Sequence, residues 1–263
     1  MSKKHRGVIQ KQFTRTIDAF SKYAVRDSAE TLAERVAYAK AQPDDLVLDV
    51  ACGPGTLVLA FAPLVKFARG IDVTLAMLMR AREYQQERQI TNAAFDRGDA
   101  EQLPYPDSAF SLVTCQFAFH HMTKPEAALK EMLRVTRPEG RLMIVDTVAP
   151  ESDEKWDLHN RVEVIRDPSH TASLRLTAFL NMFDRLGLEA VRQTVKRQPR
   201  SFDQWMLRAG LDPFHMRYRE ARKLIEDSMP ADGTGFSAQR QNGDILIVHY
   251  EGLFLLQRRA AIG

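Results

Sequence analysis

The sequence predicts an α/β fold built on a doubly wound, mostly parallel sheet. Short apolar stretches alternate with amphipathic helical stretches between residues 45 and 147, the pattern of a parallel sheet with helices in its crossovers. One of these stretches runs directly into the glycine turn Gly53-Pro54-Gly55. Nineteen residues after Gly53, a second apolar stretch ends in Asp72. A strand, a tight glycine turn and a distant acid are the parts that a nucleotide-type cofactor requires.

The first half of the chain shows the alternation clearly. Two helices come first, the earlier one carrying Phe13, Ile17 and Phe20 at helix spacing. Further helices are predicted at 55–62 and 74–88, and another opens with Thr123 and Glu126 as a capping box. The predicted strands cover residues 45–50, 66–71, 93–95, 110–115 and 141–145.

The alternation stops at Pro150. Residues 151–172 are polar and weakly periodic, so we expect a loop there. Thr177 is the expected N-cap of a helix that Gly187 ends, followed by a sixth strand at 188–195 and helical stretches at 202–209 and 215–228. Residues 236–258 alternate as strands around Asn242-Gly243, a strong hairpin signal. A hairpin cannot continue a parallel array, so at least one antiparallel strand closes the sheet.

Composition restricts the class of protein. Of the 263 residues, 44% are hydrophobic and 27% charged, as in soluble globular proteins, and a net charge of +3 is too small to predict a nucleic-acid partner. No apolar run reaches the ~18 to 20 residues of a membrane span, and the N-terminus lacks the apolar core of a signal peptide. Cys52 and Cys115 are expected to be buried free thiols. We therefore expect a cytoplasmic protein.

The glycine turn does not fit a dinucleotide site well. Such a site places glycine or alanine three residues after the second glycine, where this chain has Val58. It also often begins its loop with glycine, where this chain has Ala51. Both departures weaken the hypothesis of an NAD-type enzyme.

Four segments, taken together, match a different kind of site. They are LDVACGPGT at 48–56, GIDVT at 70–74 followed by Met77-Leu78, GDAEQLPYPD at 98–107, and EMLRVTRPEG at 131–140. In order and spacing they resemble the class I S-adenosylmethionine (SAM)-dependent methyltransferases, in particular the group around the ubiquinone and menaquinone C-methyltransferases (methyltransferase type 11). The resemblance implies a Rossmann-like, seven-stranded mixed sheet.

The resemblance also implies one domain over residues 1–263. Its expected parts are an N-terminal helical cover (1–42), a SAM-binding core (43–149), a substrate-side insertion with helices (150–235) and C-terminal strands (236–263). SAM is the implied cofactor and S-adenosylhomocysteine its product.

The resemblance assigns the donor's amino-acid end and ribose to the first two segments. The backbone of the loop would cradle the methionine portion, with the loop positions Ala51, Cys52, Gly53 and Gly55. Asp49 would lie near the ammonium group, and Asp72 would accept from both ribose hydroxyls. The alternative for Asp72 is a purely structural one, capping the helix that starts at Thr74.

The same resemblance places the adenine and the sulfonium. Val73 and Met77 would enclose adenine, Asp99 would accept from its amino group, and the amide of Ala100 would donate to the ring. Asp99 capping a turn and Met77 serving only as core are the alternatives. The sulfonium pocket would be lined by Gln116 and Phe117, and Tyr23 would close over the cofactor.

Methyl transfer from a sulfonium is an in-line displacement that depends on alignment, and it needs a base only if the acceptor must lose a proton. His120 and His121, directly after the fourth strand, are the candidate bases, although such a pair can instead hold a loop. Their spacing is not that of a metal site, so no metal is expected.

The acceptor side is expected around Phe119 and the stretch 160–170, at the carboxyl edge of the sheet. Asp167 or His170 would touch the substrate there, or Asp167-Pro168 is an ordinary turn; both interpretations stay open.

We expect a small-molecule acceptor and a monomer or homodimer. DNA is disfavoured because the segment after the fourth strand, Gln116-Phe117-Ala118-Phe119, lacks the Asn/Asp-Pro-Pro-Tyr pattern of DNA amino-methyltransferases. The remaining alternatives are a SAM-binding protein of this fold without methyl transfer and, with less support, a tRNA or protein methyltransferase or an NAD-type enzyme.

Overall fold

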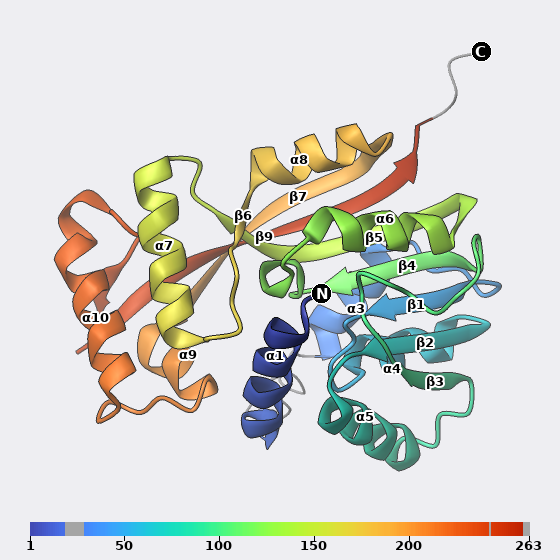
Figure 1. Ribbon diagram of the computed structural model, residues 1–263, viewed down its shortest axis with the longest axis horizontal. Coiled ribbons are helices and arrows are strands. Elements are labelled where there is room, and N and C mark those ends of the chain that lie inside the picture. The colour runs from blue at the N-terminus through green and yellow to red at the C-terminus, as the bar shows by residue number, and fades with distance from the viewer. Residues whose placement is uncertain (19–28, 242, 260–263) are drawn as a thin grey trace.

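One mixed sheet runs through the whole molecule (Figure 1). The computed structural model describes residues 1–18, 29–241 and 243–259. Seven strands form a continuous path in the order β3-β2-β1-β4-β5-β9-β7, and two short strands, β6 and β8, pair with β5 and β9. The prediction of an α/β fold with a doubly wound mixed sheet is confirmed, but the sheet has nine strands, not seven. The strands are β1 Leu46–Val50, β2 Phe67–Asp72, β3 Ala93–Arg97, β4 Phe110–Gln116, β5 Thr136–Ala149, β6 Leu174–Arg175, β7 Leu188–Ser201, β8 Gln239–Gln241 and β9 Asp244–Arg258.

The direction of the strand order changes between β1 and β4. From β1 the chain proceeds through β2 to β3 on one side, and then returns to β4 and β5 on the other, all in parallel. Open α/β sheets bind ligands at the carboxyl edge of such a switch point. Strand β9 is antiparallel to both β5 and β7, which confirms that an antiparallel strand closes the sheet.

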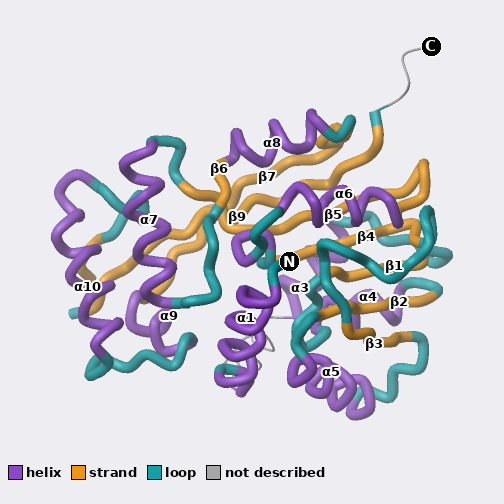
Figure 2. The backbone as a smooth tube through the Cα atoms, viewed as in Figure 1, coloured by secondary structure: helices purple, strands orange, loops and turns teal. Residues whose placement is uncertain are grey.

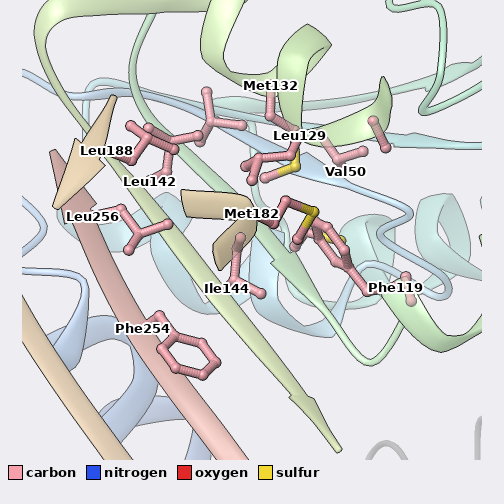
Figure 3. Packing of buried hydrophobic residues seen from close by; sticks show 14 of the residues in the cluster. Val50, Phe119, Leu129, Met132, Leu142, Ile144, Met182, Leu188, Phe254 and Leu256 are labelled. Carbon is pink, nitrogen blue, oxygen red and sulfur yellow. The ribbon is translucent and has the colours of Figure 1, made fainter. Parts of the chain in front are cut away.

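Helices cover both faces of the sheet because successive strand residues point to opposite sides. Leu142 and Ile144 of β5 pack with α6 and α8, and Figure 3 shows this core with Leu129, Met132 and Met182 around them. Met143 and Val145 face the other way, toward α3, α4 and α5. The helices are α1 Lys3–Arg15, α3 Ala29–Tyr38, α4 Thr56–Phe61, α5 Leu75–Glu87, α6 Pro125–Val135, α7 Asp153–Arg166, α8 Leu176–Arg185, α9 Phe202–Arg208 and α10 Met216–Ser228, with 3₁₀ turns at Ala62–Leu64, Phe119–His121 and Met229–Ala231.

Helices α7, α9 and α10 form a separate group at one end of the molecule (Figure 2). Their own apolar cluster includes Phe202, Trp205 and Tyr218. Helix α1 lies between this group and the β1–β4 part of the sheet, above the carboxyl edge. None of the helices in the described ranges is long and apolar enough to cross a membrane.

Three local predictions were wrong. The expected loop at 151–172 contains α7, whose buried side includes the polar residues Asn160 and Glu163, so a search for apolar periodicity misses it. Helix α8 has Arg175 as its N-cap, while Thr177 pairs with Glu151. Helix α6 has no capping box, since its N-cap is Lys124.

Other local predictions were confirmed. Gln241 of β8 is paired with Asp244 of β9, which confirms the hairpin. Both cysteines are free and buried.

Candidate cofactor and acceptor site

A cavity of about 930 Å³, partly open to solvent, lies at the carboxyl ends of β1, β2 and β4. The walls come from the loops that follow the three strands and from α1. The lining residues are Met1, Ile9, Phe13, Ala51, Cys52, Gly53, Pro54, Thr56, Ile71, Asp72, Val73, Thr74, Met77, Gly98, Ala100, Gln116, Phe117, Ala118, His121 and Met122.

The loop after β1 has a strained, left-handed backbone. Ala51, Gly53 and Gly55 all have positive φ, at 57°, 52° and 74°. A Cβ on Gly55 would lie 2.6 Å from the ring of Phe95, so glycine is required there for space as well as for backbone conformation. Strained residues of this kind concentrate at ligand sites, which makes this loop a suitable cradle for a cofactor.

Asp72 connects that loop to the next helix. Its carboxylate accepts from the Gly53 amide at 2.9 Å and from the Thr74 amide at 2.7 Å. The capping of the helix that starts at Thr74, the structural alternative for Asp72, is therefore present. Burial raises the pKa of Asp72 more than its hydrogen bonds from Thr74, Gly53 and Val73 lower it, and the side chain lines the cavity.

Asp49 is fully buried beneath the loop and lacks one partner. Its Oδ1 accepts from Thr114 Oγ1 at 2.7 Å, whereas no group in the described part of the chain hydrogen-bonds its buried Oδ2. Burial raises the pKa of Asp49 to about 7. An unsatisfied buried carboxylate oxygen is costly, and a ligand ammonium would supply what it lacks. The unpaired oxygen fits the ammonium at the amino-acid end of SAM, but Asp49 itself is not among the residues that line the cavity.

The residues expected to enclose adenine, Val73, Met77 and Ala100, all line the cavity. Met77 is only 2% exposed and also belongs to the core. Asp49, Gly55 and Asp99 are not among the lining residues. Asp99 accepts from Arg6 of α1 at 2.6 Å and from the Glu101 amide at 3.0 Å. Burial would raise the pKa of Asp99, but the Glu101 amide, the ammonium of Met1 at 3.2 Å and Arg6 outweigh burial and lower it.

Helix α1 bridges the two ends of the cavity. Gln10 Nε2 donates to the carbonyl of Val73 at 2.9 Å, on the adenine side. On the other side, His5 Nε2 lies 2.8 Å from the carbonyl of His121, and Phe13 meets the His121 ring edge-on at 5.2 Å. Sequence reasoning expected a cover here but named Tyr23, which lies outside the described residues. The helical spacing of Phe13 was the available signal.

Gln116 and Phe117 both line the cavity after β4. Gln116 Oε1 accepts from the buried Arg35 of α3 at 2.8 Å, and the Arg35 guanidinium lies 5.1 Å from the centre of the Phe117 ring. Phe117 is left-handed, with φ of 51°, so the β4 loop is strained like the β1 loop. Sequence reasoning missed Arg35, because nothing in α3 marks it as different from surface arginines.

A cluster of three histidines stands at the acceptor end. The ring centres of His120 and His121 are 4.2 Å apart, and His170 is 5.4 Å from His120. His120 Nδ1 lies 2.5 Å from a carboxylate oxygen of Asp146, while His121 Nδ1 lies 3.0 Å from the carbonyl of Ser169. Only His121 of the three lines the cavity.

Asp146 was not identified from the sequence. It is fully buried at the carboxyl end of β5, directly after the apolar residues 142–145. A carboxylate at that end of a parallel strand was the available signal.

The other substrate-side residues lie behind His121. Asp167 accepts from the amide and the hydroxyl of Ser169, at 2.8 and 2.6 Å, which is the turn considered from sequence. His170 is buried, with its Nε2 2.8 Å from Asn160 Oδ1. Phe119 is buried in the core, 6.0 Å from Phe179. None of the three lines the cavity.

The pKa values of the three histidines are shifted in different directions. Burial lowers the pKa of His121 to about 4, assisted by the neighbouring His120, and burial lowers that of His170 to about 3. Burial would also lower the pKa of His120, but Asp146 outweighs this effect and raises it. In the described part of the chain, no group of three or more His, Cys, Asp or Glu is arranged to bind a metal ion.

Comparison with known proteins places the fold and site in one family. A family model described as a methyltransferase domain matches residues 48–144. The uncharacterized methyltransferase YcgJ of Bacillus subtilis is 32% identical over 200 residues, which is 75% of this chain and 78% of YcgJ. The YcgJ crystal structure aligns with a TM-score of 0.80 at 27% identity, over 89% of this chain and 100% of YcgJ.

The chain belongs to the methyltransferase family.

Two further proteins that are similar to this chain support its membership of the family. A putative methyltransferase from Bacillus halodurans aligns with a TM-score of 0.82 at 28% identity, over 88% of this chain and 100% of that structure. The ubiquinone/menaquinone biosynthesis C-methyltransferase UbiE of Azotobacter vinelandii is 38% identical over 108 residues, 40% of this chain and 43% of UbiE. The predicted resemblance is confirmed, and the protein is a SAM-dependent methyltransferase.

Proposed function

We propose that the methyltransferase transfers the methyl group of SAM to a small-molecule acceptor, and that the acceptor reacts beside His121. One observation carries this proposal. A single cavity connects the strained loop and Asp72, at the donor end, with His121 at the other end, and α1 lies across it. In this proposal, residues 1–42 are the cover, 43–149 the donor core, and 150–235 the support of the acceptor side.

The donor half of the site has a place for each part of SAM. When bound, SAM supplies a methyl carbon on a sulfonium that the acceptor atom attacks in line, with S-adenosylhomocysteine as the product. The backbone of residues 51–55 would hold the methionine portion of SAM. Its ammonium group would donate a hydrogen bond to the unpaired Oδ2 of Asp49. Asp72 would orient the ribose, with Val73, Met77 and Ala100 around the adenine.

Several apolar side chains line the cavity together with His121. The side chains of Ile9, Phe13, Ala118 and Met122 line it, and the first two come from α1. A cover formed by a helix suits an acceptor small enough to lie beneath it, whereas a nucleic acid requires an open, cationic surface. Exclusion of water from such a space also favours methyl transfer. These features support a small molecule.

His121 is the residue best suited to take a proton from the acceptor. A carbonyl oxygen only accepts, so the 3.0 Å contact with Ser169 fixes the proton of neutral His121 on Nδ1. Its Nε2 then carries a free lone pair, and no described residue hydrogen-bonds that atom. An acceptor that has already lost its proton would not need this base.

The test is transfer of a labelled methyl group. The protein is incubated with methyl-labelled SAM and either a metabolite extract or purified tRNA and protein fractions. We expect label in a small molecule of the extract. Label only in the tRNA or protein fraction would contradict the small-molecule proposal, and SAM binding without transfer to any fraction would contradict methyl transfer itself. Once an acceptor is known, His121→Gln tests the base, and His159→Gln serves as a control at a buried histidine outside the three-histidine cluster.

A further inference from the structure

We propose that Asp146 is a positioning residue: it holds His120 as the charged imidazolium, and that charge keeps the adjacent His121 as a neutral imidazole ready to accept a proton. This inference rests on the proposed role of His121 and explains how a base can stay unprotonated in a cluster of three histidines. The residues that carry it lie on three elements: β5, the turn after β4, and the turn after α7.

The first step is the fixed position of Asp146. The side chain is fully buried at the end of β5 and accepts from two backbone amides, Phe119 and Thr147, each at 2.7 Å. A carboxylate held by amides is a rigid acceptor that stays ionised. It is therefore a fixed negative charge beside the turn that carries both histidines.

The second step is the pairing of His120. One oxygen of Asp146 lies 2.5 Å from His120 Nδ1, within hydrogen-bond distance, and an imidazolium that donates to a carboxylate forms a charge-assisted bond. The Thr171 amide and hydroxyl both donate to the His120 carbonyl at 2.8 Å, so the backbone of the turn is held as well. The His120 side chain of this ion pair is only 15% exposed, and in such a buried place a paired imidazolium is far less costly than a free one.

The third step is the effect on His121. Its ring centre is 4.2 Å from that of His120, so two positive charges would repel each other strongly at this distance. Ser169, itself held by Asp167, fixes the proton of His121 on Nδ1. The charge on His120 therefore disfavours a second proton on His121, and Nε2 is left free.

The other ionisable groups around His120 and His121 do not reverse the difference between the pKa values of these two histidines. Asp167 and Asp146 favour protonation of His121, yet burial and His120 outweigh them and its pKa is lowered. Glu163 of α7 and Asp167 add to the effect of Asp146 in raising the pKa of His120. The ring of His5, on α1, contacts the His121 carbonyl, and His170 is held neutral by burial.

The test is the titration of individual histidines by NMR in the full chain, without donor or acceptor. In the wild type we expect His120 to titrate above and His121 below the ordinary value. In Asp146→Asn the pKa of His120 should fall by about one unit or more, and that of His121 should rise by less than this, because losing the imidazolium raises it while losing the nearby charge of Asp146 lowers it. In His120→Gln, which keeps a hydrogen-bond donor toward Asp146, the pKa of His121 should rise as well.

The control is Asp45→Asn. Asp45 is also a buried carboxylate, paired at 2.5 Å with Arg141 at the opposite end of β5, so its loss imposes a similar structural cost away from the site. It should leave the histidine titrations unchanged. If His121 keeps its pKa in His120→Gln, the proposal is overturned, even if Asp146→Asn does not fold. Because this titration needs no transfer, its failure is distinct from failure of the methylation assay.

Discussion

At the residue scale, the site depends on side chains whose type is visible in the sequence but whose partners are not. Asp72 could be predicted because it ends a strand at a fixed distance from the glycine turn. The hydrogen bonds that Asp72 accepts from Gly53 and Thr74 could not be predicted, because they depend on how two loops meet. Asp146 and Arg35 were missed for the same reason: each acts through a partner that is distant in sequence, His120 and Gln116.

Asp49 leads to a prediction about protons. Because burial raises its pKa to about 7, the carboxyl is largely protonated at pH 6.5 without ligand. An ammonium beside its free oxygen would lower that pKa, so SAM binding at pH 6.5 should release up to about 0.8 of a proton. Calorimetry in buffers of different ionisation enthalpy measures this number. Asp49→Asn should abolish the release, and equal release in both proteins would remove Asp49 from the ammonium site.

At the element scale, the regular core could be predicted and the parts around it could not. Strands β1 to β5 appear as apolar runs because parallel strands are buried on both faces. Helix α7 escaped prediction because its inner side carries His159, Asn160 and Glu163. Helix α1 was predicted as a helix, but its place over the cavity follows from contacts to Val73 and His121.

A comparison of Gly55, in the β1 loop, with Gly187, after α8, separates the cost of the left-handed backbone from the cost of the close approach of Phe95. Nothing lies within 4 Å of a Cβ added at Gly187, so Gly187→Ala is destabilising only through the left-handed backbone. It should lower the free energy of unfolding by about 1–2 kcal/mol. Gly55→Ala adds a collision with Phe95 and should cost more, about 3 kcal/mol. Urea denaturation measures both values. Equal losses would contradict the close approach of Phe95 to the loop.

At the scale of the whole molecule, buried histidines control the response to acid. Burial gives four of them a folded-state pKa below that of the unfolded chain: His121, His159, His170 and His249. Between pH of about 6.5 and those lowered values the unfolded chain binds more protons, so stability falls as the pH falls. The raised pKa values of His120, Asp49 and Asp72 act in the opposite direction.

We expect the histidines with lowered pKa to prevail, because three of them fall to about 4 or 3. The midpoint of urea denaturation should therefore be lower at pH 5 than at pH 7.5. A midpoint that stays constant or rises toward pH 5 would show that these imidazoles are not buried as described.

The central claim is that the cavity at the β1–β4 switch point binds SAM through Asp72. Calorimetric titration of SAM into the wild type and Asp72→Ala tests it most directly, with Asp107→Ala, an exposed carboxylate, as the control. We predict one bound equivalent for the wild type and the control, and affinity weaker by about 1.5–3 kcal/mol, roughly 10- to 150-fold, for Asp72→Ala. No binding to the folded wild type, or unchanged affinity in folded Asp72→Ala, would contradict the claim.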